Sequence, residues 1–145
     1  MEAILRICEV LGGDRVLGRK IQSPFDLDEA VKHGLPFSSF ERVCEKIALS
    51  AAEAIDLVAS SSRTMARRKA RHQRLNAAES DRLARLARIF ARALDVLEDE
   101  EKARRWLHKP NRSLGGRVPL RVMDTDIGAL EVERVLGRLE HGIFG

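Results

Sequence analysis

Aromatic residues are scarce in this sequence, which has no tyrosine, a single tryptophan and 4% aromatic residues in all. Such residues favour strands, whereas the abundant alanine, leucine, arginine and glutamate favour helices, so we expect an all-α fold. No stretch approaches the roughly 18 apolar residues of a membrane span. The first residues also lack an apolar region followed by a cleavage site. These absences predict a cytoplasmic protein without a membrane partner.

Cysteine and histidine are also sparse, with two and four residues, and form no metal-binding pattern. Cys8 and Cys44 stand far apart among apolar neighbours, so we interpret them as small core residues in a reducing compartment. No carboxylate pair and no Ser, His, Asp arrangement stands out. We therefore expect no catalytic residue, no metal and no cofactor, and a protein that is not an enzyme. The histidines, which lack ligand spacing, are His33, His72, His108 and His141.

The length of 145 residues, with 44% hydrophobic and 33% charged residues, suits one compact domain or two small ones. Pro24 and Pro36 are expected to break helices, and one short helix is expected to start near Asp26. The sequence thus predicts an N-terminal extension over residues 1–36. A helical domain is expected over residues 37–98, and a second, smaller helical domain over residues 99–145.

Three consecutive helices are predicted after residue 37. Apolar residues from Phe40 to Ile47 recur at helical spacing, and Ser50 with Glu53 matches a capping box that begins the next helix. A serine-rich turn over residues 59–62 follows, and Ser61 is the expected N-cap of the third helix. A helix, a short turn and a basic helix make a helix-turn-helix, whose second helix enters the major groove of DNA.

Positive charge is concentrated in this third helix, although the net charge of the chain is only +4. Arginine can bridge guanine O6 and N7, so Arg63 and Arg67 are predicted to contact base edges. The other cations are predicted to contact phosphates, with Arg71 and Arg74 on the same outer face if the helix extends so far. The predicted DNA-binding residues are Ser62, Arg63, Thr64, Arg67, Arg68, Lys69, Arg71 and Arg74.

Two alternatives to DNA binding remain open at this stage. A run of cations is often a solvated face, and short motifs match by chance. The turn also departs from the usual pattern, because Ala59 stands where glycine is preferred and Ser60 where a buried aliphatic residue is common. A degenerate helix-turn-helix that never contacts DNA is therefore an alternative hypothesis.

The rest of the chain also predicts helices. Asn76 and Glu79 cap a long helix with apolar periodicity to Leu97, and Asp99 begins a short one that Pro110 ends. A glycine-containing loop over residues 111–117 and an apolar run over residues 118–123 come next. Thr125 is expected to cap the last helix, whose apolar stripe is Val132, Val135, Leu136 and Leu139, and which Gly142 closes.

The second half carries the motifs Trp106-Leu107, Pro110-Asn111, Ser113-Leu114-Gly115-Gly116-Arg117, Pro119-Leu120, Thr125, Gly128 and the run from Leu136 to Gly142. It resembles the toxin-binding domain of Xre/MbcA/ParS-type antitoxins, and residues 61–68 and 83–90 resemble the DNA-binding part of that family. The resemblance implies a type II antitoxin encoded beside a RES-domain toxin that depletes NAD. It also implies a homodimer within a toxin–antitoxin hetero-oligomer and repression of its own operon through operator DNA.

Toxin contact is predicted for Arg117 and the chain end, where apolar residues stand exposed unless a partner covers them. We expect the last helix and tail to block the active-site cleft of the toxin, with packing onto the chain's own domain as the competing hypothesis. An ordinary transcription regulator is the remaining alternative. The predicted toxin-binding residues are Arg117, Arg138, Glu140, His141, Gly142, Ile143, Phe144 and Gly145.

Overall fold

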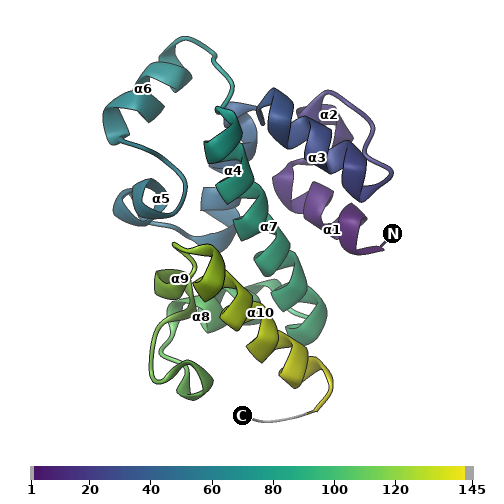
Figure 1. Ribbon diagram of the computed structural model, residues 1–145, viewed down its shortest axis with the longest axis vertical. Helices are drawn as coiled ribbons and strands as arrows, with labels where there is room; N and C mark the ends of the chain where they lie inside the picture. Colours follow the sequence, from purple (N-terminus) through teal and green to yellow (C-terminus); the bar gives the residue numbers. More distant parts are fainter. Residues whose placement is uncertain (1, 143–145) are drawn as a thin grey trace. The chain divides into compact units, whose positions relative to one another are not determined.

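The computed structural model describes residues 2–142, and these form helices joined by turns, which confirms the predicted all-α fold (Figure 1). Within this range no helix combines the length and apolar character needed to cross a membrane. In chain order the elements are α1 (Glu2–Leu11), α2 (Gly13–Leu17), α3 (Pro24–His33), α4 (Phe37–Ile47), α5 (Ala51–Leu57), α6 (Ser62–Ala70), α7 (Ala77–Leu97), α8 (Glu100–His108), the 3-10 turn η1 (Arg112–Leu114), α9 (Pro119–Val122) and α10 (Asp126–Glu140).

The chain forms two compact units, residues 1–87 and 88–145, and the boundary lies inside the long helix α7 (Figure 1). The sequence predicts domains over residues 37–98 and 99–145, with a boundary just after the end of α7. These domain limits stay a prediction. Residues 1–36, which the sequence predicts to be an N-terminal extension, contain α1, α2 and α3 and belong to the first compact unit.

The short helix expected to start near Asp26 is present as α3, but the expectation that Pro24 breaks helices is wrong. Helix α3 begins at Pro24, two residues before Asp26, because Ser23 caps it by accepting a hydrogen bond from the Asp26 N–H. Proline is tolerated at the first helical position, where its missing N–H would have no partner inside the helix. Pro24 therefore begins a helix that it was expected to break.

The core of the first unit forms where α1 packs on α2 and α4. Leu11, Val43 and Ile47 are fully buried there. Cys8, one helical turn before Leu11 on α1, is also buried. Burial raises the pKa of the Cys8 thiol, and likewise that of the half-buried Cys44, from 9.0 to about 11. Both cysteines are free thiols, as expected of small core residues.

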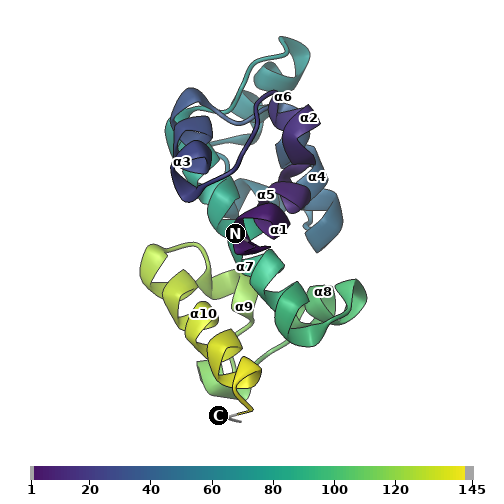
Figure 2. The ribbon, with the colours of Figure 1, turned by 90° about the vertical axis from the view of Figure 1, so that its right-hand side faces the viewer.

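In the second unit, α9 packs against both α8 and α10 (Figure 2). The sequence predicts no secondary structure for the apolar run over residues 118–123. In the structure this run contains α9, because Pro119 begins a helical turn that buries Leu120. Leu107 and Leu136 are fully buried in the same unit. Helices α8, α9 and α10 thus belong to this unit, together with the second half of α7.

Candidate functional site

Helix α6 is fixed at its start by a side-chain cap and along its length by one buried residue. The Ser61 hydroxyl accepts a hydrogen bond from the Thr64 N–H at 3.1 Å and donates one to Thr64 Oγ1 at 2.9 Å. Met65 points inward and is 5% exposed. The cap, which the sequence predicts, and the inward methionine leave most of α6 exposed, including Ser62, Arg63, Ala66, Arg67 and Ala70.

The turn between α5 and α6 is held by polar contacts from α7. The Arg82 guanidinium donates a hydrogen bond to the Val58 carbonyl at 2.7 Å. Ser60 is exposed, and its hydroxyl lies 3.5 Å from a carboxylate oxygen of the buried Glu79. Val58 supplies the fully buried aliphatic side chain of this turn. The unusual Ala59 and Ser60 are therefore compatible with a formed helix-turn-helix.

Glu79 connects α7 to α6. Its backbone N–H donates to the Asn76 side chain at 2.8 Å, and its carboxylate accepts from the Asn76 N–H at 2.9 Å, which is the predicted capping pattern. The same carboxylate forms an ion pair with Arg68 at 2.9 Å. The Glu79 side chain is 1% exposed and that of Arg68 is 15% exposed, so this pair is largely shielded from solvent.

The segment after α6 is bound to the loop before α4. The Leu75 N–H donates to the Leu35 carbonyl at 2.9 Å, and the Arg74 guanidinium donates to the Gly34 carbonyl at 3.0 Å. Gly34 has a φ of 104°, and a Cβ there would lie 2.4 Å from the Leu75 carbonyl oxygen, so this close approach requires glycine.

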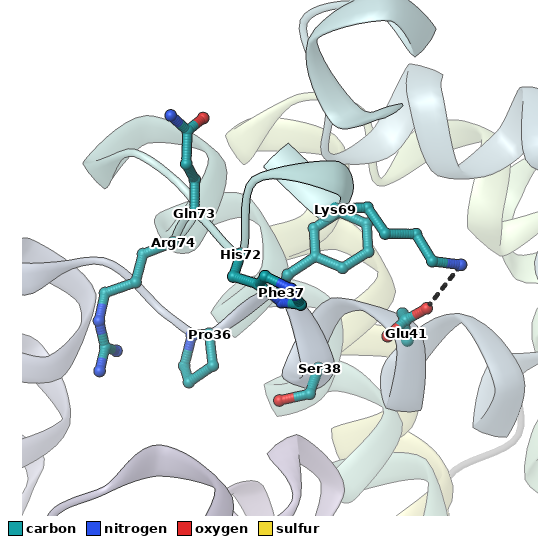
Figure 3. A pocket seen from close by; sticks show the side chains of 8 residues that line it. All are labelled: Pro36, Phe37, Ser38, Glu41, Lys69, His72, Gln73 and Arg74. Carbon is teal, nitrogen blue, oxygen red and sulfur yellow. Dashed lines mark ion pairs between the residues drawn. The ribbon is translucent and has the colours of Figure 1, made fainter. Parts of the chain in front are cut away.

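A surface pocket of about 450 Å³ lies where these segments meet, between the start of α4 and the end of α6 (Figure 3). On one side of it Lys69 forms an ion pair with Glu41 at 3.2 Å. Arg74 and His72 come from the segment that follows α6.

The expectation that Arg71 and Arg74 extend the outer face of α6 is wrong. The helix ends at Ala70, Arg71 is its C-cap residue, and His72 adopts a left-handed backbone conformation with a φ of 52°. Arg74 consequently lies in the following loop, where it binds a backbone carbonyl.

The six cations of the basic segment fall into two groups. Arg68, Lys69 and Arg74 each have a partner within the first unit. Arg63, Arg67 and Arg71 are exposed and make no ion pair or side-chain hydrogen bond with any residue of the described range 2–142. The free cations therefore lie on the outward face of α6 and at its C-terminal end.

The predicted loop of the second unit is a defined turn. The Asn111 side chain accepts from the Ser113 N–H at 2.8 Å, and Asn111 and Arg117 form an isolated antiparallel bridge. The Arg117 guanidinium donates to the Leu114 carbonyl at 3.1 Å, while the residue as a whole is exposed. This turn presents Arg117 to solvent, as the sequence suggests.

Helix α10 begins where predicted, because the Thr125 hydroxyl accepts from the Gly128 N–H at 3.0 Å. Gly128 packs directly against the preceding segment: a Cβ at this position would lie 1.6 Å from the Val122 carbonyl oxygen. The buried stripe is Ala129, Val132, Val135 and Leu136, whereas the predicted Leu139 is only half-buried.

Four of the eight residues predicted to contact a toxin lie at the end of α10 or directly after it. Glu140 forms an ion pair with Arg92 of α7 at 2.7 Å, Arg138 is half-buried, and His141 is the exposed C-cap residue. Gly142 has a φ of 74° and closes the helix as predicted. Ile143, Phe144 and Gly145 lie outside the described residues.

The sequence interpretation missed two features of these surfaces. Glu79 was recognised as a cap but not as the partner of Arg68, because nothing local links the two positions. Ile127 and Leu130 are exposed, at 77% and 48%, on the first half of α10. Their spacing from the buried stripe, which begins at Ala129, is the signal that places them on another face of the helix.

These observations define a class: a helix-turn-helix unit with free arginines on its second helix, followed by a separate small helical unit. A family model described as the antitoxin Xre-like helix-turn-helix domain matches residues 26–88. Another, described as the antitoxin Xre/MbcA/ParS C-terminal toxin-binding domain, matches residues 92–142.

Similar proteins agree with both matches. "Antitoxin Xre" of Yersinia enterocolitica is 33% identical over 135 residues, which cover 90% of this chain and 91% of that protein. "Antitoxin Xre" of Photorhabdus laumondii is 31% identical over 130 residues, covering 89% and 88%. The "Prs ADP-ribosylating antitoxin" of a Sphingobium species is 26% identical over 131 residues, covering 84% and 82%. The chain belongs to the Xre/MbcA/ParS family of antitoxins, which confirms the resemblance identified from its motifs.

Proposed function

We propose that this protein neutralises a co-encoded RES-domain toxin that depletes NAD, acting by binding and not by catalysis, and represses its own operon. The proposal combines family membership with two surfaces of the chain. One is the outward face of α6 in the helix-turn-helix unit. The other is formed by Arg117 and the end of α10 in the unit that matches the toxin-binding domain. We expect a homodimer within a toxin–antitoxin hetero-oligomer.

The outward face of α6 is the observation that carries the DNA-binding part of the proposal. Arg63 and Arg67 are exposed and unpaired on it, and the small Ala66 between them allows a close approach to base edges. Arg71 follows at the helix end, where a phosphate contact supplies affinity without sequence preference. Ser62 and Thr64 flank Arg63 in the first turn.

The three cations that have partners, Arg68, Lys69 and Arg74, are assigned a different role in this proposal. Arg68 and Arg74 hold α6 and the following loop in position through Glu79 and the Gly34 carbonyl. Lys69 has an exposed partner, so a phosphate can compete for it. Phosphate contact by these three residues stays a prediction.

Fluorescence anisotropy with the protein's own promoter and a scrambled duplex tests DNA binding. Arg63→Ala and Arg67→Ala are expected to lower the discrimination between the two duplexes by about 1–3 kcal/mol each. Arg71→Ala should weaken binding to both alike and reduce the slope of log affinity against log salt by about 1. Arg15→Ala, which removes an exposed charge from α2, is the matched control and should change neither quantity.

Equal loss on both duplexes in the Arg63 and Arg67 variants would show that these residues do not contact bases. Promoter affinity that does not depend on salt would favour the degenerate helix-turn-helix instead, since phosphate contacts require a steep salt dependence.

Co-expression tests neutralisation. The full chain should restore growth and cellular NAD in bacteria that express the neighbouring toxin, whereas the toxin alone should stop growth. A variant that lacks residues 141–145 keeps the Arg92–Glu140 ion pair and so separates loss of the tail from loss of the helix. If the tail blocks the active-site cleft, this variant should still bind the toxin but no longer protect NAD. Undiminished protection would contradict the blocking hypothesis.

The relative from Sphingobium is named as an ADP-ribosylating antitoxin, so ADP-ribosylation is an alternative chemistry for the toxin–antitoxin pair. Under this alternative we propose that the toxin transfers ADP-ribose from NAD to a protein and releases nicotinamide. The two chemistries are distinguished by NAD carrying a label in its adenosine part, since only transfer leaves labelled protein in cells that express the toxin.

A further inference from the structure

Two exposed apolar side chains occupy the first half of α10. Ile127 is 77% exposed and Leu130 is 48% exposed, and they are the large apolar residues of the described range 88–142 with such exposure. They lie three positions apart in sequence, so they are neighbours on one face of the helix. Exposed apolar residues that adjoin in this way indicate a surface for a partner.

Their outward direction is enforced by the packing of α10. The Thr125 cap fixes the first turn, and the backbone of Gly128 touches the Val122 carbonyl so closely that no side chain fits between them. Ala129, two positions after Ile127, is 1% exposed. Rotation of the helix would break these contacts, so Ile127 and Leu130 cannot turn into the core of the second unit.

The same face continues toward the end of α10. At helical spacing, Ile127 and Leu130 are followed by Arg134, Arg138 and His141. Arg134 is paired with Glu131, whereas Arg138 and His141 form no ion pair within the described part of the chain. The face is thus apolar at its beginning and basic at its end, and its basic end belongs to the residues already proposed to contact the toxin.

We propose that Ile127 and Leu130 form the apolar part of the toxin-binding surface and insert into an apolar groove of the toxin. Acidic side chains at one end of that groove would face Arg138 and His141. The inference rests on the proposed function and extends it from the chain end to the first half of α10. An amphipathic helix laid in a groove is a recurrent mode of recognition, with residues at these spacings in contact.

The toxin is the favoured occupant over a second copy of this chain for two reasons. Both residues lie within residues 92–142, which match a family model described as a toxin-binding domain. Two side chains on one helix also provide far less than the roughly 800 Å² per partner that a stable interface requires, so a self-association through this patch alone would be weak. A toxin groove that also contacts the end of α10 supplies the missing area.

The test compares two double variants by isothermal titration with the purified toxin. Ile127→Gln with Leu130→Gln should weaken binding roughly 100-fold, because each buried aliphatic side chain accounts for about a factor of ten. The matched control is Leu5→Gln with Phe25→Gln, whose side chains are 48% and 79% exposed in the first unit. It should bind the toxin like the wild type.

Further measurements keep the result interpretable. Both double variants should retain the circular dichroism and promoter affinity of the wild type, and Leu130→Met, which preserves volume and apolar character, should bind the toxin within about threefold of wild type. If Ile127→Gln with Leu130→Gln does not fold, Ile127→Gln alone takes its place, with roughly a tenfold loss expected.

Wild-type affinity of a folded Ile127 variant overturns the inference, as does a loss of self-association with toxin binding unchanged. Failure of the wild-type protein itself to bind the toxin contradicts the proposed function instead.

Discussion

Replacing Glu79 by alanine is expected to destabilise the helix-turn-helix unit more than any exposed charge substitution in it. The carboxylate is 1% exposed and has two close partners, the Asn76 N–H at 2.9 Å and the Arg68 guanidinium at 2.9 Å, besides the Ser60 hydroxyl at 3.5 Å. Alanine removes all of these interactions at once, and the two close ones determine the expected loss. It also leaves Arg68, whose side chain is 15% exposed, without its counter-charge.

The magnitude follows from the two losses. A helix-capping interaction contributes about 1 kcal/mol. Breaking a fully buried ion pair costs about 3–5 kcal/mol, but Arg68 keeps some access to water, so about 1–2 kcal/mol is expected here. Glu79→Ala should thus lower the free energy of unfolding by about 2–3 kcal/mol. Glu79→Gln keeps an acceptor for the Asn76 N–H and should cost about 1–2 kcal/mol.

Urea denaturation followed by far-UV circular dichroism measures this change. Tryptophan fluorescence is unsuitable because the only tryptophan of the sequence, Trp106, lies in the second unit and does not report on the first. Asp28→Asn is the control. It breaks an ion pair with Lys32 at 2.9 Å, but the side chains are 52% and 73% exposed, so no measurable change is expected. A Glu79→Ala protein as stable as the Asp28→Asn protein would refute the assignment of a structural role to the Arg68–Glu79 pair.

The remaining predictions concern α10 and the thiols. Gly128→Ala should destabilise the protein by about 2 kcal/mol or more, because its Cβ would overlap the Val122 carbonyl oxygen. At Gly137 a Cβ would meet only the Arg92 guanidinium, at an ordinary contact distance of 3.8 Å, so Gly137→Ala should stabilise α10 by about 0.5–1 kcal/mol. Thermal unfolding measures both, and a neutral Gly128→Ala would contradict the close approach. The pKa of the Cys8 and Cys44 thiols is raised from 9.0 to about 11, so between these values the unfolded chain loses thiol protons that the folded chain keeps. Stability should therefore fall as pH rises through this window, and a Cys8→Ala, Cys44→Ala variant should show a shallower fall in its urea midpoint.

Helix boundaries set by local capping were predictable from the sequence. Ser50 with Glu53, Asn76 with Glu79, and Thr125 all begin helices as expected, because a cap needs only a side chain and an N–H three residues away. Pro24 misled the prediction because proline both breaks helices and begins them, and the Ser23 cap decides between these roles. The apolar run that became α9 was ambiguous, since short apolar runs suit several structures.

The partners of the basic residues could not be predicted in this way. Arg68 pairs with Glu79 and Arg74 with the Gly34 carbonyl only because tertiary packing brings these segments together. In sequence, six cations in twelve residues look alike. In the structure, three have partners in the first unit and three are free within the described residues, which separates positioning residues from candidate DNA contacts.

Helix α6 is held in place by polar contacts because most of its surface is exposed to solvent. Met65 is its one buried residue, so apolar burial alone gives this nine-residue helix little hold on the core. More apolar residues would have to replace the exposed polar and small residues to which we assign DNA contact. The helix is instead held at its edges, by the Ser61 cap and by the pairing of Arg68 with Glu79, which leave Arg63 and Arg67 unobstructed. The Arg68–Glu79 pair is therefore expected to affect DNA binding by fixing the orientation of the helix that carries Arg63 and Arg67.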